Sequence, residues 1–283
     1  MGLKALLVAA LAALCVASSS SAEVAQPRVL IIGDSVATGM LWHTKAIAVM
    51  QRGLDVEWEV AVCRTLIDPG CPFEGDRPPS LLDLVGALGS VPPLVVVEVG
   101  YNDELSTFDD ALDQSMTALV AAGAKHVLWL TLHEAREPFP ELNRLLERAP
   151  ARWPQLELVD WNAAAQGHSD DWFQNDYLHL KETGGIAMAH LVHGAVLARL
   201  DPLRIATAPL RLRAGRGYSL RLRAVGGTPP YRWRVESGRP PHGFHLLADG
   251  RVAARVGTGR HQTFTLAVED ADGVTATMTA SAR

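Results

Sequence analysis

Apolar residues along the first two hundred positions alternate between short segments with strand character and stretches with helical spacing. The short runs predict strands at 29–32, 56–62, 94–99, 126–132 and 156–160. The helical stretches lie between and after them, at about 35–51, 80–88, 108–120, 141–152 and 182–200. This alternation predicts an α/β fold in which a parallel sheet is covered by helices on both faces.

Beyond residue 200 the apolar pattern changes to a period of two. Alternating segments at 210–213, 220–223, 231–235, 264–268 and 274–279, separated by Gly/Pro-rich or Asp/Gly-rich turns, predict a small all-β sandwich. The charge changes at the same place. Residues 1–200 hold 13 basic and 25 acidic side chains, whereas residues 201–283 hold 13 arginines and 6 acidic side chains. We therefore expect two domains, at 27–200 and 205–283.

The N-terminus has the pattern of a secretory signal peptide. Lys4 precedes an apolar stretch at 5–17, and small residues follow at 18–22. The apolar stretch is shorter than the roughly 20 residues that a membrane-spanning helix needs. We expect residues 1–22 to be removed and the mature chain, which has no later segment apolar enough to span a bilayer, to be secreted or periplasmic, in or at the cell envelope.

Removal of residues 1–22 would take away Cys15 and leave two cysteines, Cys63 and Cys71. Export would place this pair in an oxidising compartment. Pro69 and Gly70 between them favour a turn, so the pair is expected to form a disulfide. A metal site would need more ligands than this pair supplies, and no metal or cofactor is predicted.

Three polar islands lie beyond predicted strand ends or in the loop before the last helix: 33–35, 100–103 and 176–179. In parallel sheets, sites gather at the carboxyl ends of the strands. A serine hydroxyl becomes a good nucleophile when a positioned base takes its proton. Ser35 is expected at the start of a helix, with His179 as its base and Asp176 orienting the imidazole. The plainer interpretation is that Asp34 or Ser35 caps the helix and His179 is an ordinary surface residue.

The second island supplies an amide rather than an acid or base. The Asn102 side chain can donate to a developing oxyanion, together with the backbone N–H of Ser35. The alternative is a local Asx turn. Gly100 is expected to turn the chain out of its strand, and Asp103 to cap the next helix.

The segments Gly33-Asp34-Ser35, Gly100-x-Asn102-Asp103 and Asp176-x-x-His179 resemble blocks I, III and V of the SGNH (GDSL-type) hydrolase family, over residues 28 to about 198. The resemblance implies a flavodoxin-like three-layer α/β/α fold and metal-free acyl-ester chemistry. It also implies that Ser35 is the nucleophile, His179 the base, Asp176 its orienting partner and Asn102 an oxyanion donor, with structural support from Gly33, Asp34 and Gly100.

One block departs from that pattern. Block II of the family supplies a glycine whose N–H completes the oxyanion hole, but the loop at 61–66 contains none. The N–H of Cys63 or Arg64 is expected to replace it. The Arg64 side chain could also contact an anionic substrate group, or form a solvent-facing ion pair.

The segment from 227 to 273 resembles a bacterial Ig-like or cadherin-like module, which implies a spacer or adhesion role. The resemblance rests on Gly227-Thr228-Pro229-Pro230-Tyr231-x-Trp233, Pro240-Pro241-x-Gly243-Phe244 and Asp270-x-Asp272-Gly273. Its arginines could meet an anionic cell-envelope surface. They could equally face the acidic first domain or be a solvated face. No nucleic-acid-binding motif is present.

Together these features predict a secreted serine esterase that hydrolyses acyl or acetyl esters of small molecules or glycans through an acyl-enzyme on Ser35. An acyltransferase using the same site is a close variant. The competing hypothesis is a non-catalytic surface-binding protein that works through its second domain.

Overall fold

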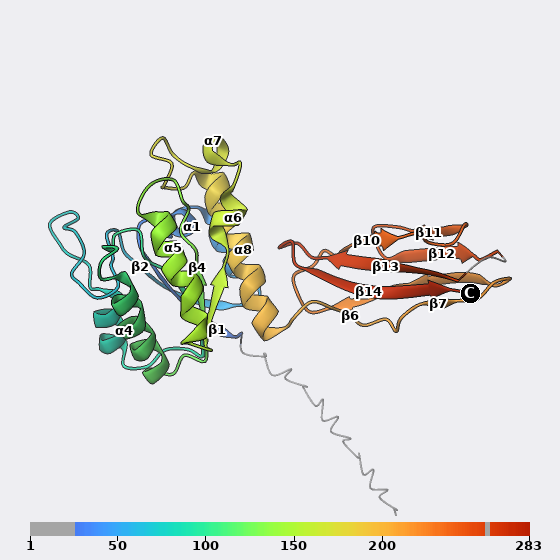
Figure 1. Cartoon of the computed structure of the whole chain (residues 1–283), viewed down its shortest axis with the longest axis horizontal. Helices are drawn as coiled ribbons and strands as arrows, with labels where there is room; N and C mark the ends of the chain where they lie inside the picture. Colours follow the sequence, from blue (N-terminus) through green and yellow to red (C-terminus); the bar gives the residue numbers. More distant parts are fainter. Residues whose placement is uncertain (1–25, 258–260) are drawn as a thin grey trace, which may run out of the picture.

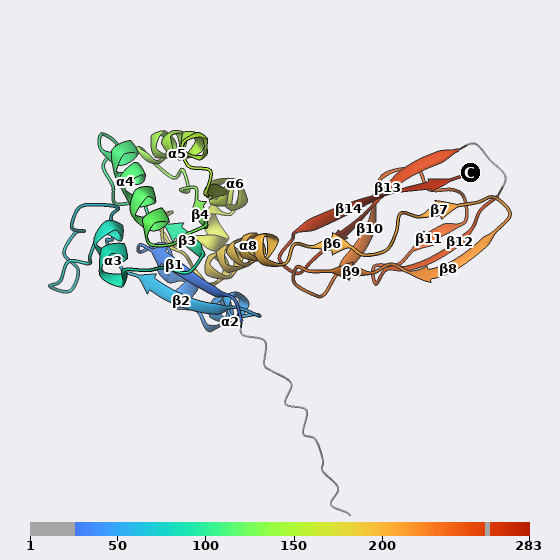
Figure 2. The same cartoon turned by 90° about the horizontal axis from the view of Figure 1, so that it is seen from below.

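The computed structural model describes residues 26–257 and 261–283 (Figures 1 and 2). The predicted signal peptide at 1–22 lies outside the described residues. Within them, no helix combines the length and the apolar character needed to cross a bilayer. The chain forms an α/β part followed by an all-β part, and helix α8 leads from one to the other (Figure 1).

The α/β part is built on a five-stranded parallel sheet. Its strands are β1 (Arg28–Gly33), β2 (Asp55–Val60), β3 (Leu94–Glu98), β4 (His126–Leu130) and β5 (Leu156–Val159). They lie in the order β2-β1-β3-β4-β5, all parallel, which is the flavodoxin-like order. The α/β prediction and the strand order that the resemblance implied are therefore confirmed.

Helices cover the sheet on both faces. They are α1 (Thr38–Leu41), α2 (Thr44–Met50), α3 (Leu81–Leu88), α4 (Phe108–Ala121), α5 (Phe139–Arg148), α6 (Trp161–Ala165), α7 (Ser169–Trp172) and α8 (Glu182–Leu200). α1, α2 and α8 pack on one another, and α3, α4 and α5 form the layer on the other side (Figure 2). The side chains of 29–32 and 95–97 are fully buried between these layers, as the apolar runs predicted.

The predicted helix over 35–51 is wrong. The chain forms a turn at 35–37, then α1 and α2, which are separated at Trp42 and His43. His43 adopts extended backbone angles and ends any continuity between the two helices. Ser35 therefore lies in a turn, three residues before α1, rather than on a helix N-terminus. The short helices α6 and α7 were not predicted either.

The C-terminal part is all β, as predicted. One sheet has the order β10-β13-β14-β7 and the other β11-β12-β8, with a small pair β6-β9. The strands are β6 (Arg204–Ile205), β7 (Arg211–Leu212), β8 (Gly217–Arg221), β9 (Ala224–Val225), β10 (Arg232–Gly238), β11 (Phe244–Leu246), β12 (Arg251–Arg255), β13 (Gln262–Glu269) and β14 (Thr275–Ala282). Trp233, Val252 and Leu266 come from different strands of both large sheets and share one core. The likeness to an Ig-like module stays a prediction.

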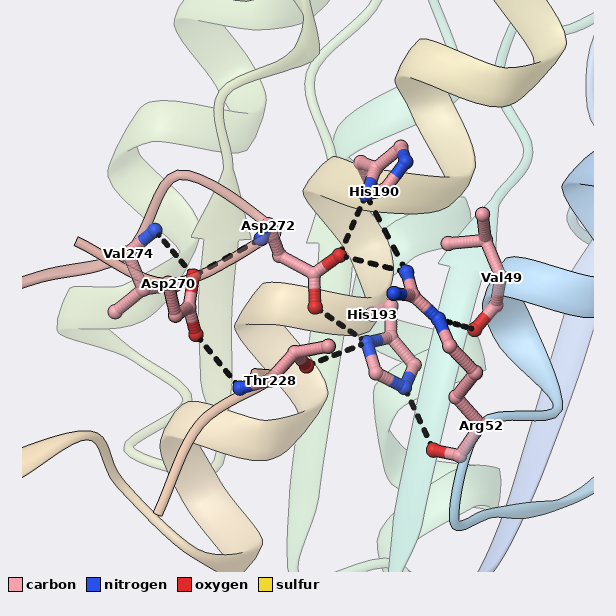
Figure 3. Close-up of polar contacts among 8 residues, drawn as sticks. All are labelled: Val49, Arg52, His190, His193, Thr228, Asp270, Asp272 and Val274. Carbon is pink, nitrogen blue, oxygen red and sulfur yellow. Dashed lines mark hydrogen bonds and ion pairs between the residues drawn. The ribbon is translucent and has the colours of Figure 1, made fainter. Parts of the chain in front are cut away.

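The two parts meet at a polar cluster that α8 shares with the turn between β13 and β14 (Figure 3). The Asp272 carboxylate, which is fully buried, bonds His190 Nδ1 through Oδ1 and His193 Nδ1 through Oδ2, both at 2.6 Å. Arg52, just after α2, donates to Oδ1 at 3.1 Å. One carboxylate of the all-β part is thus held by two segments of the α/β part.

His193 lies at the centre of this cluster and contacts both parts of the chain. Its ring is fully buried, with Nδ1 facing the Asp272 carboxylate and Nε2 facing the carbonyl oxygen of Arg52 at 2.9 Å. Both partners are hydrogen-bond acceptors, so the two ring nitrogens connect Asp272 to the end of the segment that carries Arg52. Burial opposes ionisation of Asp272, but hydrogen bonds from the two histidines and Thr228 outweigh it and place the pKa far below its ordinary value.

Asp272→Asn tests how much this cluster holds the two parts together. Removing one partner of a buried ion pair leaves the other charge uncompensated, at a cost of about 3 kcal/mol. We expect a clearly lower thermal unfolding midpoint at pH 7. Asp249→Asn, which removes an exposed pairing with Arg221 and Arg251, is the matched control and should change little.

The same cluster gives a pH dependence. Because the pKa of Asp272 is lowered on folding, its contribution is present above the ordinary pKa of about 3.9 and declines as the pH falls below that value. The stability difference between wild type and Asp272→Asn should therefore shrink in acid. An equal difference at pH 7 and pH 3 would contradict this account.

Candidate active site

The segment after β1 is a tight turn that returns against its own strand. A Cβ on Gly33 would lie 2.3 Å from the Cβ of Ala37, so only glycine allows the turn to close this far. The Asp34 N–H donates to the carbonyl oxygen of Glu98 at 2.9 Å, which ties the turn to the end of β3. Ser35 follows at the carboxyl edge of the sheet, partly exposed.

Asp34 is buried beneath this turn and joins it to the next loop. Its Oδ1 accepts from Val36 N at 2.9 Å, and its Oδ2 accepts from Tyr101 N at 3.3 Å. Burial raises the pKa of Asp34 to about 6, although these hydrogen bonds act in the opposite direction. Glu98 is equally buried beside it, and burial together with the Asp34 charge raises its pKa well above the ordinary value.

The loop before α8 places the imidazole of His179 within hydrogen-bonding distance of the Ser35 hydroxyl. His179 Nε2 lies 3.0 Å from Ser35 Oγ, and His179 Nδ1 lies 2.6 Å from Asp176 Oδ2. The other oxygen of Asp176 accepts from the N–H groups of Leu178 and His179, each at 3.0 Å. Partial burial opposes ionisation of Asp176, but the hydrogen bonds from the imidazole and the two N–H groups outweigh it and lower the pKa.

A close helix contact holds the serine turn and the histidine loop together. Gly185, in the first turns of α8, packs against the backbone of α1, where a Cβ would lie 2.0 Å from the carbonyl oxygen of Gly39. A Cβ on Gly39 would in turn lie 2.6 Å from the Cβ of Leu180, the residue after His179. These residues were not singled out from the sequence. The paired glycines at 184–185, inside a helical pattern, were the signal that could have found them.

Asn102 lies in the loop after β3, next to the serine turn. Its Nδ2 donates to the carbonyl oxygen of Arg64 at 3.1 Å and lies 3.5 Å from Asp34 Oδ2. The preceding Gly100 has φ of +153°, which agrees with the predicted turn out of the strand. The predicted cap by Asp103 is wrong: its carboxylate accepts from Leu66 N at 2.9 Å and so anchors the loop after β2.

Arg64 does not have the predicted role. Its N–H donates to the carbonyl oxygen of Ala61 at 3.2 Å and is not free for an oxyanion. Its side chain is buried and donates to the carbonyl oxygens of Pro79 at 2.7 Å and Gly33 at 3.3 Å, so it meets neither solvent nor substrate. Two backbone acceptors inside the loop satisfy the guanidinium, which the sequence could not reveal.

Of the two backbone N–H groups that were expected to face an oxyanion, that of Cys63 remains as a candidate. The predicted disulfide with Cys71 is confirmed, and Cys63 has φ of +67°, a conformation that favours glycine. Among the described residues, no acceptor is found for the backbone N–H of Cys63 or for that of Ser35. Cys63 thus combines a left-handed backbone conformation with an N–H that has no partner among the described residues.

Comparison with curated proteins found similarity over part of the chain only. A Staphylococcus aureus (strain MSSA476) protein named "Putative O-acetyltransferase SAS0844" is 32% identical over 96 residues, which is 33% of this chain. The chain spans 15% of that protein's length, and its counterpart in strain MW2 matches to the same extent. No family model matches the chain.

Solved structures that are similar to the chain include several esterases. A carbohydrate acetylesterase from Sinorhizobium meliloti is 17% identical with a TM-score of 0.44, covering 61% of this chain and 99% of its own. The inhibitor-bound aryl esterase of M. smegmatis is 15% identical with a TM-score of 0.43, covering 59% and 98%. At these values neither likeness assigns an activity, which has to come from the residues of this chain.

Gly185→Ala tests the helix contact behind the site. The added methyl group would force α8 away from Gly39, so we expect a lower thermal unfolding midpoint. The control is Gly86→Ala in α3, where no atom lies within 4 Å of the added Cβ. There the better helix propensity of alanine should stabilise the protein by up to about 1 kcal/mol. Equal responses of the two variants would show that the α1–α8 contact is loose.

Proposed function

We propose that this chain is a serine esterase of the SGNH (GDSL-type) kind, exported from the cell, which hydrolyses acyl or acetyl esters through an acyl-enzyme on Ser35. The observation that carries the proposal is the continuous set of hydrogen bonds from Asp176 through His179 to Ser35, at 2.6 and 3.0 Å. The parallel sheet and its flavodoxin-like strand order are consistent with it.

The proton path follows from the acceptor at each end. Asp176 is an acceptor only, so Nδ1 of His179 carries the hydrogen and Nε2 is free to take the proton of the Ser35 hydroxyl. Ser35 Oγ then attacks the ester carbonyl carbon, and the imidazolium returns the proton to the leaving alcohol. Water, activated by the same imidazole, releases the acid and restores Ser35.

The negative charge that develops on the carbonyl oxygen needs donors on one side of Ser35. The free N–H groups of Ser35 and Cys63 are proposed for this role, with the Asn102 amide as third donor. One amide hydrogen of Asn102 is taken by the Arg64 carbonyl, and the other has only the long 3.5 Å contact with Asp34. That second hydrogen is available to a substrate oxyanion.

Exposed apolar side chains accompany each of the three segments that carry the site. Trp42 follows α1 and is 65% exposed, Tyr177 precedes His179 by two residues and is 52% exposed, and Leu105 follows Asn102 and is 38% exposed. Asp176 and Asn102 are themselves exposed. Exposed site residues, with exposed aromatic side chains nearby in sequence, suit a short acyl group on a larger alcohol, such as a glycan.

Acyl transfer is the second candidate. The part of this chain that is 32% identical to a Staphylococcus aureus protein named as an O-acetyltransferase favours it. The two activities share the acyl-enzyme and differ in whether water or another alcohol accepts the acyl group. Product analysis in the presence of an added alcohol would separate them.

The nucleophile is tested by Ser35→Ala. The mature protein should release p-nitrophenol from short-chain p-nitrophenyl esters, and the variant should lose this turnover and labelling by a fluorophosphonate while its thermal unfolding changes little. His179→Asn should behave in the same way. A wild type that is inert on all acyl lengths and does not label would instead favour a non-catalytic binding protein.

Asn102→Ala tests the oxyanion donors separately. Loss of one such donor lowers kcat about 100- to 1000-fold in well-studied hydrolases. We expect a fall of that order in kcat with KM nearly unchanged, measured on the same esters. A parallel rise in KM, or a collapse of the unfolding midpoint, would mean that Asn102 acts only by holding the Arg64 carbonyl.

A further inference from the structure

The second domain carries a groove of about 960 Å³ along one side of β14. Segment 203–213 forms most of its other wall, and His261 and Thr263 also line it. β13 pairs with β14 along the whole of the opposite side, but on the groove side β7 pairs only with Ser281 and Ala282. Within the part of the chain that the structure describes, no strand is hydrogen-bonded to 275–280 there, although β6 lies near β14.

The unpaired stretch presents backbone donors and acceptors to the groove. Ser281 N donates across the groove side to the carbonyl oxygen of Leu210 at 2.9 Å. In an antiparallel ladder, the N–H and C=O of successive residues point alternately to the two sides. The N–H and C=O groups of Thr279 and Thr277 therefore point the same way as those of Ser281, and on this side they have no hydrogen-bond partner among the described residues.

The walls of the groove are basic and contain no acidic residue. Segment 203–213 contributes Arg204, Arg211 and Arg213, and the end of β14 leads to Arg283. Arg204 pairs with Asp201 at 3.2 Å. The other three form no ion pair with any described residue. The groove thus combines a free strand edge with uncompensated positive charge.

We infer that this groove binds an acidic peptide segment in extended conformation, which adds as a new strand beside β14. A peptide backbone repeats a donor and an acceptor at the spacing that Thr277 and Thr279 present, whereas a polysaccharide has hydroxyl groups without that register. Acidic side chains on the added strand would meet Arg211, Arg213 and Arg283. This surface belongs to the second domain and acts independently of the chemistry at Ser35.

The probe is a fluorescein-labelled decapeptide of alternating glutamate and threonine, added to the full-length protein. Fluorescence polarisation should show saturable binding that weakens as salt is added. An alternating lysine–threonine decapeptide should not bind. In the complex, the amide hydrogens of Thr277 and Thr279 should exchange more slowly with solvent, because both would be hydrogen-bonded to the added strand.

Two variants separate strand addition from charge attraction. Thr277→Pro removes the N–H that faces the groove and leaves the hydrogen bonds to β13 in place, since proline is tolerated where its missing N–H faces outward. Thr277→Val keeps the N–H and is its control. We expect at least tenfold weaker binding for Thr277→Pro and for Arg211→Gln/Arg213→Gln, and unchanged binding for Thr277→Val, with ester turnover unaffected in all three.

Several results would overturn the proposal. The first is that the acidic decapeptide does not bind. The second is that an oligogalacturonate binds as tightly as the decapeptide and that Thr277→Pro does not weaken its binding. The third is that the amides of Thr277 and Thr279 exchange no more slowly in the complex. A dimer of the free protein that is lost in Arg211→Gln/Arg213→Gln would assign the groove to a second copy of this chain. If Thr277→Pro does not fold, the exchange of the two amides in the wild-type complex decides.

Discussion

A single buried carboxyl group, that of Asp34, sets the positions of the loops at the carboxyl edge of the sheet. It accepts N–H groups from the turn after β1 and from the loop after β3, with the Asn102 amide nearby. Burial of an acidic group is costly, and the donors around it offset part of that cost. The pKa of Asp34 is raised to about 6 because these donors do not offset the whole cost of burial. The serine turn keeps its place because this carboxyl group lies beneath it.

The sheet and the positions of the polar islands could be predicted because both follow from local pattern. Continuous apolar runs such as 29–32 have to be buried on both faces, and polar residues directly after them have to lie at the strand ends. The helix over 35–51 failed for a tertiary reason. The helical conformation ends at His43, which is extended. The position of Gly39 depends on its contact with Gly185 of α8, which lies far away in sequence.

Charged residues were the hardest to place from sequence. Arg64 looked like a solvent or substrate contact, yet two carbonyl oxygens satisfy it in the interior. Asp272 was read correctly as a turn residue, but nothing local indicated that His190, His193 and Arg52 would surround it. In both cases the partners lie in distant segments, so the role of the charge appears only once the chain is folded.

The length of α8 has a consequence for what the two ends of the protein can touch. The helix begins three residues after His179 and has 19 residues, so it is about 28 Å long, and the second domain follows directly. The hydrogen bonds of Asp272 to His190 and His193 hold the all-β part against α8. They therefore keep the distance between the all-β part and Ser35 constant. A small molecule at Ser35 therefore cannot reach the far end of the all-β part, and only an extended partner could contact both ends of the protein at the same time.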